Sequence, residues 1–345
     1  MTITLAVDGT RFTGWTEATV TRSLDAVAGR FDLKVTRSQG NLADLLRLDE
    51  GNACTVLLDG HPLITGWIEV YSPQLASNSL SLSISGRDRT GDLMDCTANN
   101  RPGQWHHQPL QRIVANLLSP FGLTASIDGE TGQPFPTFTL EPSETVVDAL
   151  RRLCRGRGLL LTPDGNGNLQ LVKPATTLEP IALKQGENIR TAAAEFTTAN
   201  RFSPITVRGQ SAPDATSRGR TTNGATATVT DPAVKRHRPL TITARGQATQ
   251  ADCQRQALWE LASRNGQALS LKITLPFWRQ QPNGRLWDVN QLVQVVAPSV
   301  FINEALIIKQ VTWRIDRSGG QQASLTLVRP SAYTPQPLPP EPVKA

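Results

Sequence analysis

Apolar and polar residues alternate in short runs along much of the chain, and this period of two is typical of half-buried β-strands. Residues 3–7 and 80–85 are two such runs. Asp8-Gly9 and Asp59-Gly60 stand between runs, and Asp-Gly is a strong hairpin signal. The close spacing of strands and turns predicts that residues 1–87 form a first β domain of the barrel or sandwich type.

The pattern changes over residues 88–180. Residues 108–118 and 143–155 carry apolar positions at helical spacing, and Ser143 is the predicted N-cap of the second helix. A hairpin is predicted over residues 159–172, with the turn Asp-Gly-Asn-Gly-Asn at its tip. This region is therefore expected to be a compact α+β insert.

Alternation returns over residues 181–329, which are predicted to form a second β-barrel-like domain with one helix. Thr249 is the expected N-cap of that helix and Asn265-Gly266 its C-cap. Residues 330–345 are rich in proline and are expected to lie extended. The predicted fold class is mainly β, with two β-barrel-like domains flanking a smaller α+β domain.

The strand that ends at Gly86 leads directly into a charged stretch. Arg87, Asp88, Arg89 and Asp92 follow it, and they are predicted to form a polar, salt-bridged junction between the first domain and the insert. Asp88, Asp92 and Asp95, at spacings of four and three residues, are also considered as paired carboxylates for glycoside hydrolysis. The flanking arginines favour the structural interpretation.

Composition narrows the functional classes. The chain has 345 residues, of which 39% are hydrophobic and 19% charged, and it contains no apolar run long enough for a transmembrane helix. Its first residues lack the basic and apolar regions of a signal peptide. The protein is therefore expected to remain in the compartment where it is made, with no stable membrane insertion.

No recognisable catalytic or metal-binding motif is present. The four cysteines lack the spacing of a zinc or thioredoxin site and are expected to be free and buried. His106-His107 has no partner at ligand spacing, and the Asp164 turn lacks the twelfth-position glutamate of a calcium loop. The sequence predicts no cofactor, no metal and no enzymatic activity.

Positive charge is concentrated in one segment. The net charge of the chain is +6, and residues 201–245 alone hold eight basic and two acidic residues, which also sum to +6. Such a segment favours a polyanion or an acidic protein partner, although a solvated loop is the simpler alternative. Separately, Trp278 and Trp287 lie in a polar segment between strands and are predicted to anchor a subunit interface.

Three stretches together resemble one family. They are SGRDRTGDLMDCTA at residues 85–98, Trp15 with VTRSLDAVAGRFDLKVT at residues 20–36, and a helix from residue 145 followed by DGNGNLQLVKP. In order and spacing these are similar to baseplate hub proteins of Mu-like contractile-tailed phages, which are related to late control D and type VI spike hub domains.

The resemblance implies a structural virion protein of the tail baseplate, assembled in the host cytoplasm. It implies a homotrimeric ring in which two β-barrel-like domains per chain make a pseudo-sixfold arrangement. Such a ring joins the sixfold tail tube to a threefold central spike, contacts other baseplate proteins and lets phage DNA pass during ejection. The resemblance also implies that the spike is a separate protein.

A channel for DNA should not bind DNA tightly, because lysine and arginine contacts to phosphate add strong affinity. Five basic residues are therefore predicted to face a neighbouring protein or the outer surface, with channel lining as the weaker alternative: Arg218, Arg220, Lys235, Arg236 and Arg238. Two other functions are also considered. A peptidoglycan hydrolase would need a carboxylate pair in a cleft, and a nucleic-acid-binding regulator would need a recognition element that the sequence lacks.

Overall fold

The computed structural model describes residues 2–38, 48–77, 79–155, 157–210, 224–282, 284–316 and 320–334. Of the Pro-rich residues 330–345, the first four form a 3-10 helix, η5 (Pro330–Tyr333), so the expected extended conformation is wrong for them. Residues 335–345, together with Arg218 and Arg220, lie outside the described residues.

The N-terminal alternation forms seven strands. Asp8 and Asp59 adopt positive φ angles of 48° and 49°, and each is followed by a glycine in the same region, as hairpins with two-residue turns require. The strands are β1 (Ile3–Val7), β2 (Thr10–Phe12), β3 (Glu17–Ser23), β4 (Arg30–Ser38), β5 (Ala53–Leu58), β6 (His61–Ala76) and β7 (Ser79–Asp88).

A second group of strands comes from the C-terminal part of the chain. These strands are β13 (Leu183–Lys184), β14 (Thr191–Phe196), β18 (Leu269–Leu275), β19 (Leu292–Ala297), β20 (Ile302–Asp316) and β21 (Gly320–Val328). Two short 3-10 helices, η4 (Pro298–Val300) and η5 (Pro330–Tyr333), follow β19 and β21 respectively.

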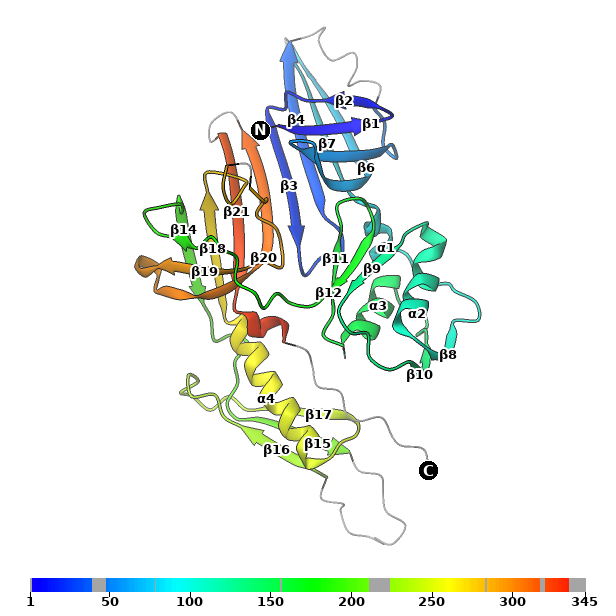
Figure 1. Cartoon of the computed structure of the whole chain (residues 1–345), viewed down its shortest axis with the longest axis vertical. Coiled ribbons are helices and arrows are strands. Elements are labelled where there is room, and N and C mark those ends of the chain that lie inside the picture. The colour runs from blue at the N-terminus through cyan, green and yellow to red at the C-terminus, as the bar shows by residue number, and fades with distance from the viewer. Residues whose placement is uncertain are drawn as a thin grey trace.

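The two groups of strands form one continuous sheet. Strand β3 pairs antiparallel with β20, from Glu17 opposite Asp316 to Ser23 opposite Gln310, and Figure 1 shows the two strands side by side. The strand order runs β14-β18-β21-β20-β3-β4-β7-β6-β5-β1-β2, with β19 joined to β20 and β13 to β19. We call the β3–β20 pairing the seam.

One hydrophobic core lies behind both halves of this sheet. It includes Phe31 and Leu33 from β4 together with Val311 and Trp313 from β20, all of them buried. The two ends of the sheet, β14 and β2, do not pair with each other among the described strands. The expected barrel-like domains are therefore regions of a shared open sheet, and no closed barrel is formed by the described residues.

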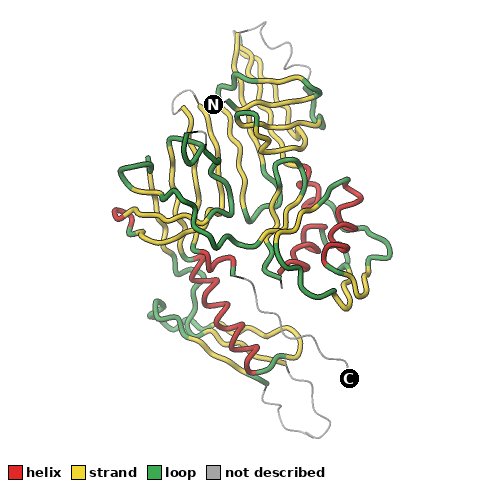
Figure 2. The backbone as a smooth tube through the Cα atoms, in the orientation of Figure 1, coloured by secondary structure: helices red, strands yellow, loops and turns green. Residues whose placement is uncertain are grey.

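The insert has its own core and lies beside the large sheet (Figure 2). Its second long helix is capped by Thr145, whose Oγ1 accepts a hydrogen bond from the amide of Asp148 at 3.2 Å, so the expected cap at Ser143 is wrong. The elements are η2 (Arg89–Gly91), α1 (Asp92–Asp95), β8 (Gln104–Gln108), α2 (Leu110–Leu118), η3 (Ser119–Phe121), β9 (Ala125–Asp128), β10 (Phe135–Thr139), α3 (Val146–Arg155), β11 (Leu160–Pro163) and β12 (Leu169–Val172).

Residues 181–329 contain a separate module in addition to their part of the large sheet. Strands β15 (Ile205–Gln210), β16 (Thr226–Val229) and β17 (Leu240–Gln247) form a three-stranded sheet of their own. The helix α4 (Gln250–Gln267) covers this sheet, and a small core that includes Val207 and Cys253 lies between them. Figure 1 shows this module below the large sheet.

Both ends of α4 were predicted, and one prediction is correct. Thr249 is the N-cap and forms a capping box with Asp252. The helix continues through Asn265 and Gly266, however, and ends at Gln267. Gly266 permits close packing instead, because a Cβ there would lie 2.1 Å from the amide nitrogen of Ala332 in η5. Within the described residues, none of the helices has the length and apolar character needed to span a membrane.

Candidate assembly site at the junction of the domains

Asp88 ends β7 and is buried at the point where the large sheet meets the insert. Its carboxylate accepts hydrogen bonds from the amides of Gly29 (2.7 Å) and Thr65 (3.2 Å). Burial raises the pKa of Asp88 to about 7, although these bonds and the nearby Arg22 oppose the shift. Asp88 thus fixes the loop before β4 and the strand β6 to the end of β7.

The neighbouring charges do not pair with each other as the sequence suggested. Arg87 donates to Glu69 (2.7 Å) and Asp95 (2.5 Å), so it connects β6 to α1. These contacts, Asp95 foremost, raise the pKa of Arg87. Arg89 donates to two backbone carbonyls, of Phe121 (3.3 Å) and Gly122 (3.4 Å).

Asp92 forms no ion pair with another described residue. Arg87 pairs with Asp95 instead. The expected four-residue salt-bridged junction is therefore replaced by separate contacts. Each of Arg87, Asp88 and Arg89 fastens a different element to the end of β7. The result is a junction between the first β region and the insert at the predicted position, with different pairing.

Arg22 on β3 connects three parts of the chain and was not identified from the sequence. Its side chain is buried, and it donates to Asp288 of the second β region at 2.8 Å and to the carbonyl of Pro163 at the end of β11. In the sequence, Arg22 lies in an alternating strand among small or apolar residues. This unusual position for an arginine was the signal that could have identified it.

The tip of the β11–β12 hairpin rests on β6. Asp164 closes the turn by accepting bonds from the amides of Asn166 (2.7 Å) and Asn168 (2.9 Å), as expected for a turn. Thr65 donates to the carbonyl of Gly165 at 2.9 Å. A Cβ at Gly165 would lie 2.7 Å from the carbonyl oxygen of Pro62, so only glycine allows this approach.

Asp25, in the loop after β3, gathers a second set of contacts. Its carboxylate binds Lys309 of β20 (2.5 Å) and accepts from the hydroxyl of Tyr333 in η5 (3.0 Å), and its carbonyl accepts from Arg151 of α3 (3.4 Å). Burial, with Asp25 nearby, raises the pKa of Tyr333. Asp25 therefore holds the C-terminal η5 against both β regions and the insert.

The predicted interface tryptophans lie inside the chain. Trp278 and Trp287 are both buried in the shared core. The indole nitrogen of Trp278 donates to the carbonyls of Arg314 (3.2 Å) and Gln322 (2.9 Å). The polar residues around them misled the prediction, because these indoles point inward and present almost no surface to another subunit.

In the segment 201–245, the basic residues that the structure describes lie in different surroundings. Arg201 is paired with the buried Asp231 at 2.6 Å, and this pairing lowers the pKa of Asp231. Arg238 lies over the ring of Phe202, 4.7 Å from its centroid, and donates to the carbonyl of Ala199. Lys235 and Arg236 are exposed on the loop between β16 and β17.

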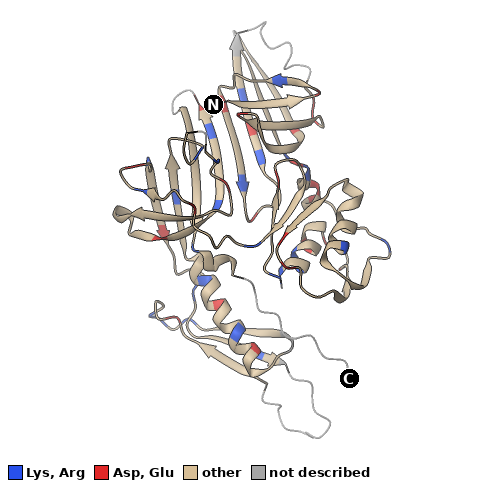
Figure 3. Ribbon diagram, in the orientation of Figure 1, with Lys and Arg blue, Asp and Glu red and all other residues tan. Residues whose placement is uncertain are grey.

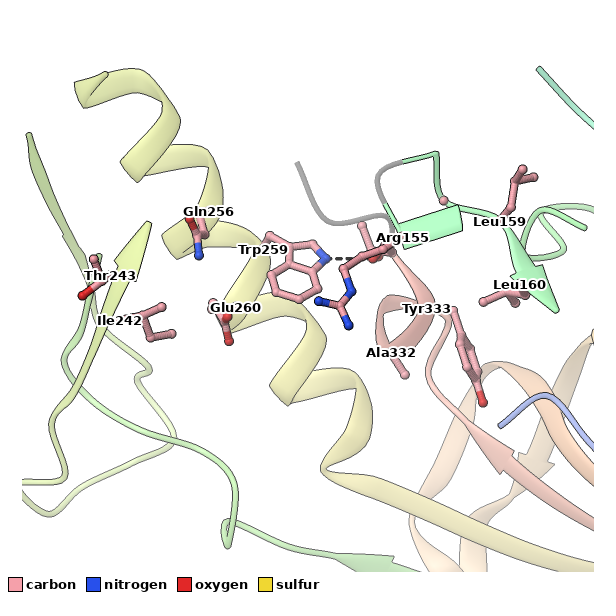
Figure 4. Close-up of a pocket in the computed structure, with 12 residues that line it drawn as sticks. Arg155, Leu159, Leu160, Ile242, Thr243, Gln256, Trp259, Glu260, Ala332 and Tyr333 are labelled. Atoms are coloured by element: carbon pink, nitrogen blue, oxygen red, sulfur yellow. Dashed lines mark hydrogen bonds between the residues drawn. The ribbon is translucent and has the colours of Figure 1, made fainter. Parts of the chain in front are cut away.

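A pocket of about 530 Å³ lies where the insert, α4 and η5 approach one another. Figure 4 shows Trp259 of α4, Arg155 at the end of α3 and Tyr333 of η5 around it. The indole nitrogen of Trp259 donates to the carbonyl of Thr334 at 2.7 Å. The lining is a mixture of apolar groups and single charges, typical of a gap between modules.

The described residues contain no group of three or more histidine, cysteine, aspartate or glutamate side chains that could hold a metal ion. Two of the three carboxylates considered for glycoside hydrolysis are engaged in other contacts. Asp88 is buried and accepts hydrogen bonds from backbone amides. Asp95 is paired with Arg87, which lowers the pKa of Asp95. The geometry is that of a rigid structural junction.

Four family descriptions match successive parts of the chain. Residues 2–88 match "Mu phage baseplate assembly protein GpP-like, N-terminal" and residues 90–173 match "Baseplate hub protein gp44-like, second domain". Residues 201–258 match "Tail protein NMB1110-like, third domain" and residues 249–336 match "Mu phage baseplate assembly protein GpP, fourth domain". The third match covers the separate module of β15–β17 and the first half of α4.

The curated baseplate hub protein gp44 of Escherichia phage Mu is 35% identical over 336 residues, which cover 94% of this chain and 87% of that protein. A 43 kDa tail protein of prophage MuSo2 from Shewanella oneidensis has a similar crystal structure, with a TM-score of 0.86 and 31% identity over 98% of this chain and 100% of that chain.

Two more distant structures share the fold. A tail protein from Neisseria meningitidis MC58 has a TM-score of 0.81 at 24% identity, covering 98% of this chain and 99% of that one. A type VI secretion component of E. coli, the c3393 protein, has a TM-score of 0.55 at 15% identity, covering 99% and 81%.

The phage Mu and MuSo2 relatives are structural baseplate and tail proteins rather than enzymes. The hub resemblance seen in the sequence is confirmed by the extent of the match to phage Mu gp44. The chain belongs to the family of Mu-like phage baseplate hub proteins, structural components of the virion tail.

Proposed function

We propose that this protein forms a homotrimeric ring at the centre of the baseplate. The ring joins the sixfold tail tube to a threefold central spike protein and contacts other baseplate proteins. Phage DNA passes through the ring during ejection. Each chain contributes two β regions, so three chains present six β regions around one axis.

The observation that carries this proposal is the seam. A ring that matches a sixfold tube with three chains needs two β regions placed next to each other in every chain. The β3–β20 pairing joins the two regions edge to edge over seven residue pairs, and a common core lies behind them. Such a joined pair acts as one wall segment, and identical segments that meet head to tail form a ring when the rotation between neighbours closes.

The basic loop between β16 and β17 is proposed to contact a protein partner outside the channel. Lys235 and Arg236 are exposed there, on a module that is separate from the large sheet. An exposed cationic loop fits an acidic protein surface. Arg218 and Arg220 belong to the same basic segment and are proposed to serve the same contact.

The ring is tested by measuring the mass of the purified protein with light scattering and imaging it by electron microscopy. We expect a particle of three times 37.5 kDa, about 112 kDa, with a central hole. A monomer at micromolar concentration, or a closed particle without a hole, would contradict the proposal.

The basic loop is tested by the double variant Lys235→Glu and Arg236→Glu. We expect the ring mass to be unchanged, because the loop is outside the large sheet, and incorporation of the variant into baseplates to be lost. Arg11→Glu, which changes an exposed arginine of the β1–β2 hairpin, serves as the control. Normal particle assembly with the loop variant would count against a partner contact.

A further inference from the structure

The hairpin between β19 and β20 carries an exposed aromatic residue at its tip. We call residues 298–301 the apex; it consists of η4 and Phe301, which directly follows η4. Phe301 is 87% exposed, the largest fraction among the exposed large apolar side chains in the described part of the chain. Its φ angle is 61°, in the left-handed region where a side chain with a Cβ is strained.

Both features of Phe301 oppose the stability of a single chain. A left-handed backbone favours glycine, and an apolar ring that stays in water contributes none of the free energy that burial would supply. Strained residues that persist in a fold tend to cluster where the fold meets a ligand or undergoes a functional change. The benefit of Phe301 is therefore expected in a contact with another molecule.

The apex is held in one conformation by Gln185, in the turn after β13. The side-chain nitrogen of Gln185 donates to the hydroxyl of Ser299 at 2.8 Å, and its side-chain oxygen accepts from the backbone amide of Ser299 at 3.1 Å. The backbone amide of Phe301 donates to the carbonyl of Pro298 at 3.0 Å. Because a preorganised residue loses little freedom on binding, the apex is suited to insertion into a pocket.

A pocket without charged groups lies on the insert. It has a volume of about 850 Å³, lies between α2 and β9, and is lined by apolar side chains such as Val114, Leu123 and Ile127 together with amide and hydroxyl groups. None of the described residues that line it is charged. The apex is also uncharged, and Figure 3 shows it in tan at the left edge of the molecule. We call this cavity the α2–β9 pocket.

The apex and the α2–β9 pocket lie at opposite sides of the chain. Figure 1 shows β19 at the left of the large sheet and α2 at the right, and Figure 2 shows η4 as a short helix at the left edge. In a ring of identical chains, each chain uses two different patches, one for each neighbour. A protruding apex on one side and a pocket on the other meet this requirement.

We propose that Phe301 of each chain inserts into the α2–β9 pocket of the next chain and anchors the contact between subunits. This inference rests on the ring proposed above and names residues that hold it together. Interface anchors are typically aromatic side chains that fill pockets, and the centre of an interface is poor in charge. Insertion removes the ring of Phe301 from water and so offsets the strain of its backbone.

The first test is Phe301→Gly, which removes the ring and also relieves the strain. Sedimentation velocity over a dilution series should show that the protein concentration at which the trimer dissociates rises by at least about tenfold. At a dilution where both proteins are single chains, the melting temperature of the variant should equal or exceed that of the wild type. A lower melting temperature there would mean that Phe301 stabilises its own chain, and would overturn the proposal.

The control for this variant is Leu75→Ala, which truncates another exposed apolar side chain, on β6. We expect the trimer of Leu75→Ala to dissociate at the wild-type concentration. An equal weakening by both variants would show a general effect of exposed apolar surface and would contradict an anchor at Phe301.

The second test joins the two sides of the contact by charge. Ala115 is an exposed residue of α2 that lines the pocket. Phe301→Lys and Ala115→Glu should each weaken the trimer, and the double variant should dissociate at a lower concentration than either single variant. Ala251→Glu, at an exposed position of α4, is the matched control and should not rescue Phe301→Lys. Rescue by neither glutamate, or by both equally, would overturn the pairing.

The mass of the wild type separates this inference from the ring itself. If the wild type is a trimer and Phe301→Gly dissociates at the same concentration, the ring stands and the contact through Phe301 is wrong. If the wild type is a monomer at micromolar concentration, the ring and the contact are both wrong.

Discussion

Buried charged side chains hold the junction together at the level of single residues. Asp88 and Arg22 both lie within the protein, and each connects segments that are distant in sequence. Buried charges are costly unless they are hydrogen-bonded, and removing one partner leaves the other group without compensation. The junction is therefore sensitive to single substitutions and to pH.

The Asp88 carboxyl should make stability depend on pH. Its folded-state pKa is raised from 3.8 to about 7, so the folded protein keeps a proton that the unfolded chain loses. The stability that this proton contributes is full below about pH 4 and is lost as the pH rises through about 7. We expect the melting temperature of Asp88→Asn to increase relative to that of the wild type as the pH is raised from about 5 to about 8.

The control for that comparison is Asp128→Asn, which changes an exposed aspartate of the insert. Its melting temperature should follow the wild type at every pH. If the melting temperature of Asp88→Asn also changed with pH as that of the wild type does, the pKa of Asp88 would not be raised in the folded state.

Replacing Arg22 should cost more than replacing a surface arginine. In Arg22→Ala, Asp288 and the carbonyl of Pro163 both lose their partner, and we expect a loss of about 3 kcal/mol in the free energy of unfolding. Arg11→Ala, at an exposed position, should change it by less than about 0.5 kcal/mol. Denaturant titration of both variants measures this, and equal midpoints would show that Arg22 is not a structural link.

At the level of elements, α4 shows how packing overrides propensity. Alanine is favoured over glycine by about 1 kcal/mol in an exposed helix. Gly266, however, faces the backbone of η5 at a distance that excludes a Cβ. We expect Gly266→Ala to lower the melting temperature, while Gln254→Ala on the exposed side of the same helix leaves it unchanged or slightly higher. A rise with Gly266→Ala would mean that η5 does not pack there.

Local sequence patterns predicted most helices and strands of this chain, but they did not predict the contacts between those elements. Alternation marked the strands, and Thr249 marked the start of α4 correctly. The separate module was missed because its core is built partly from small residues, such as Ala227 and Ala244, which give little periodic signal. The seam was missed because Thr21 and Thr312 are 291 residues apart, and no local pattern encodes such a pairing.

Across the whole molecule, the seam should make the two β regions unfold as one unit. They share a sheet and a core, whereas the β15–β17 module has a small core of its own. We expect hydrogen exchange in increasing denaturant to release the amides of β15–β17 first and those of β3 and β20 together at higher concentration. Loss of protection in β3 well before β20 would contradict a common unit.

The distance between β3 and β20 along the chain has a consequence for synthesis on the ribosome. When β3 and β4 have been made, the edge of β3 that faces the seam has no partner until β20 has also left the exit tunnel. An open strand edge is a template for pairing with other chains. The nascent chain therefore carries this open strand edge throughout the interval between the synthesis of β3 and that of β20, and this edge can pair with other chains during that interval.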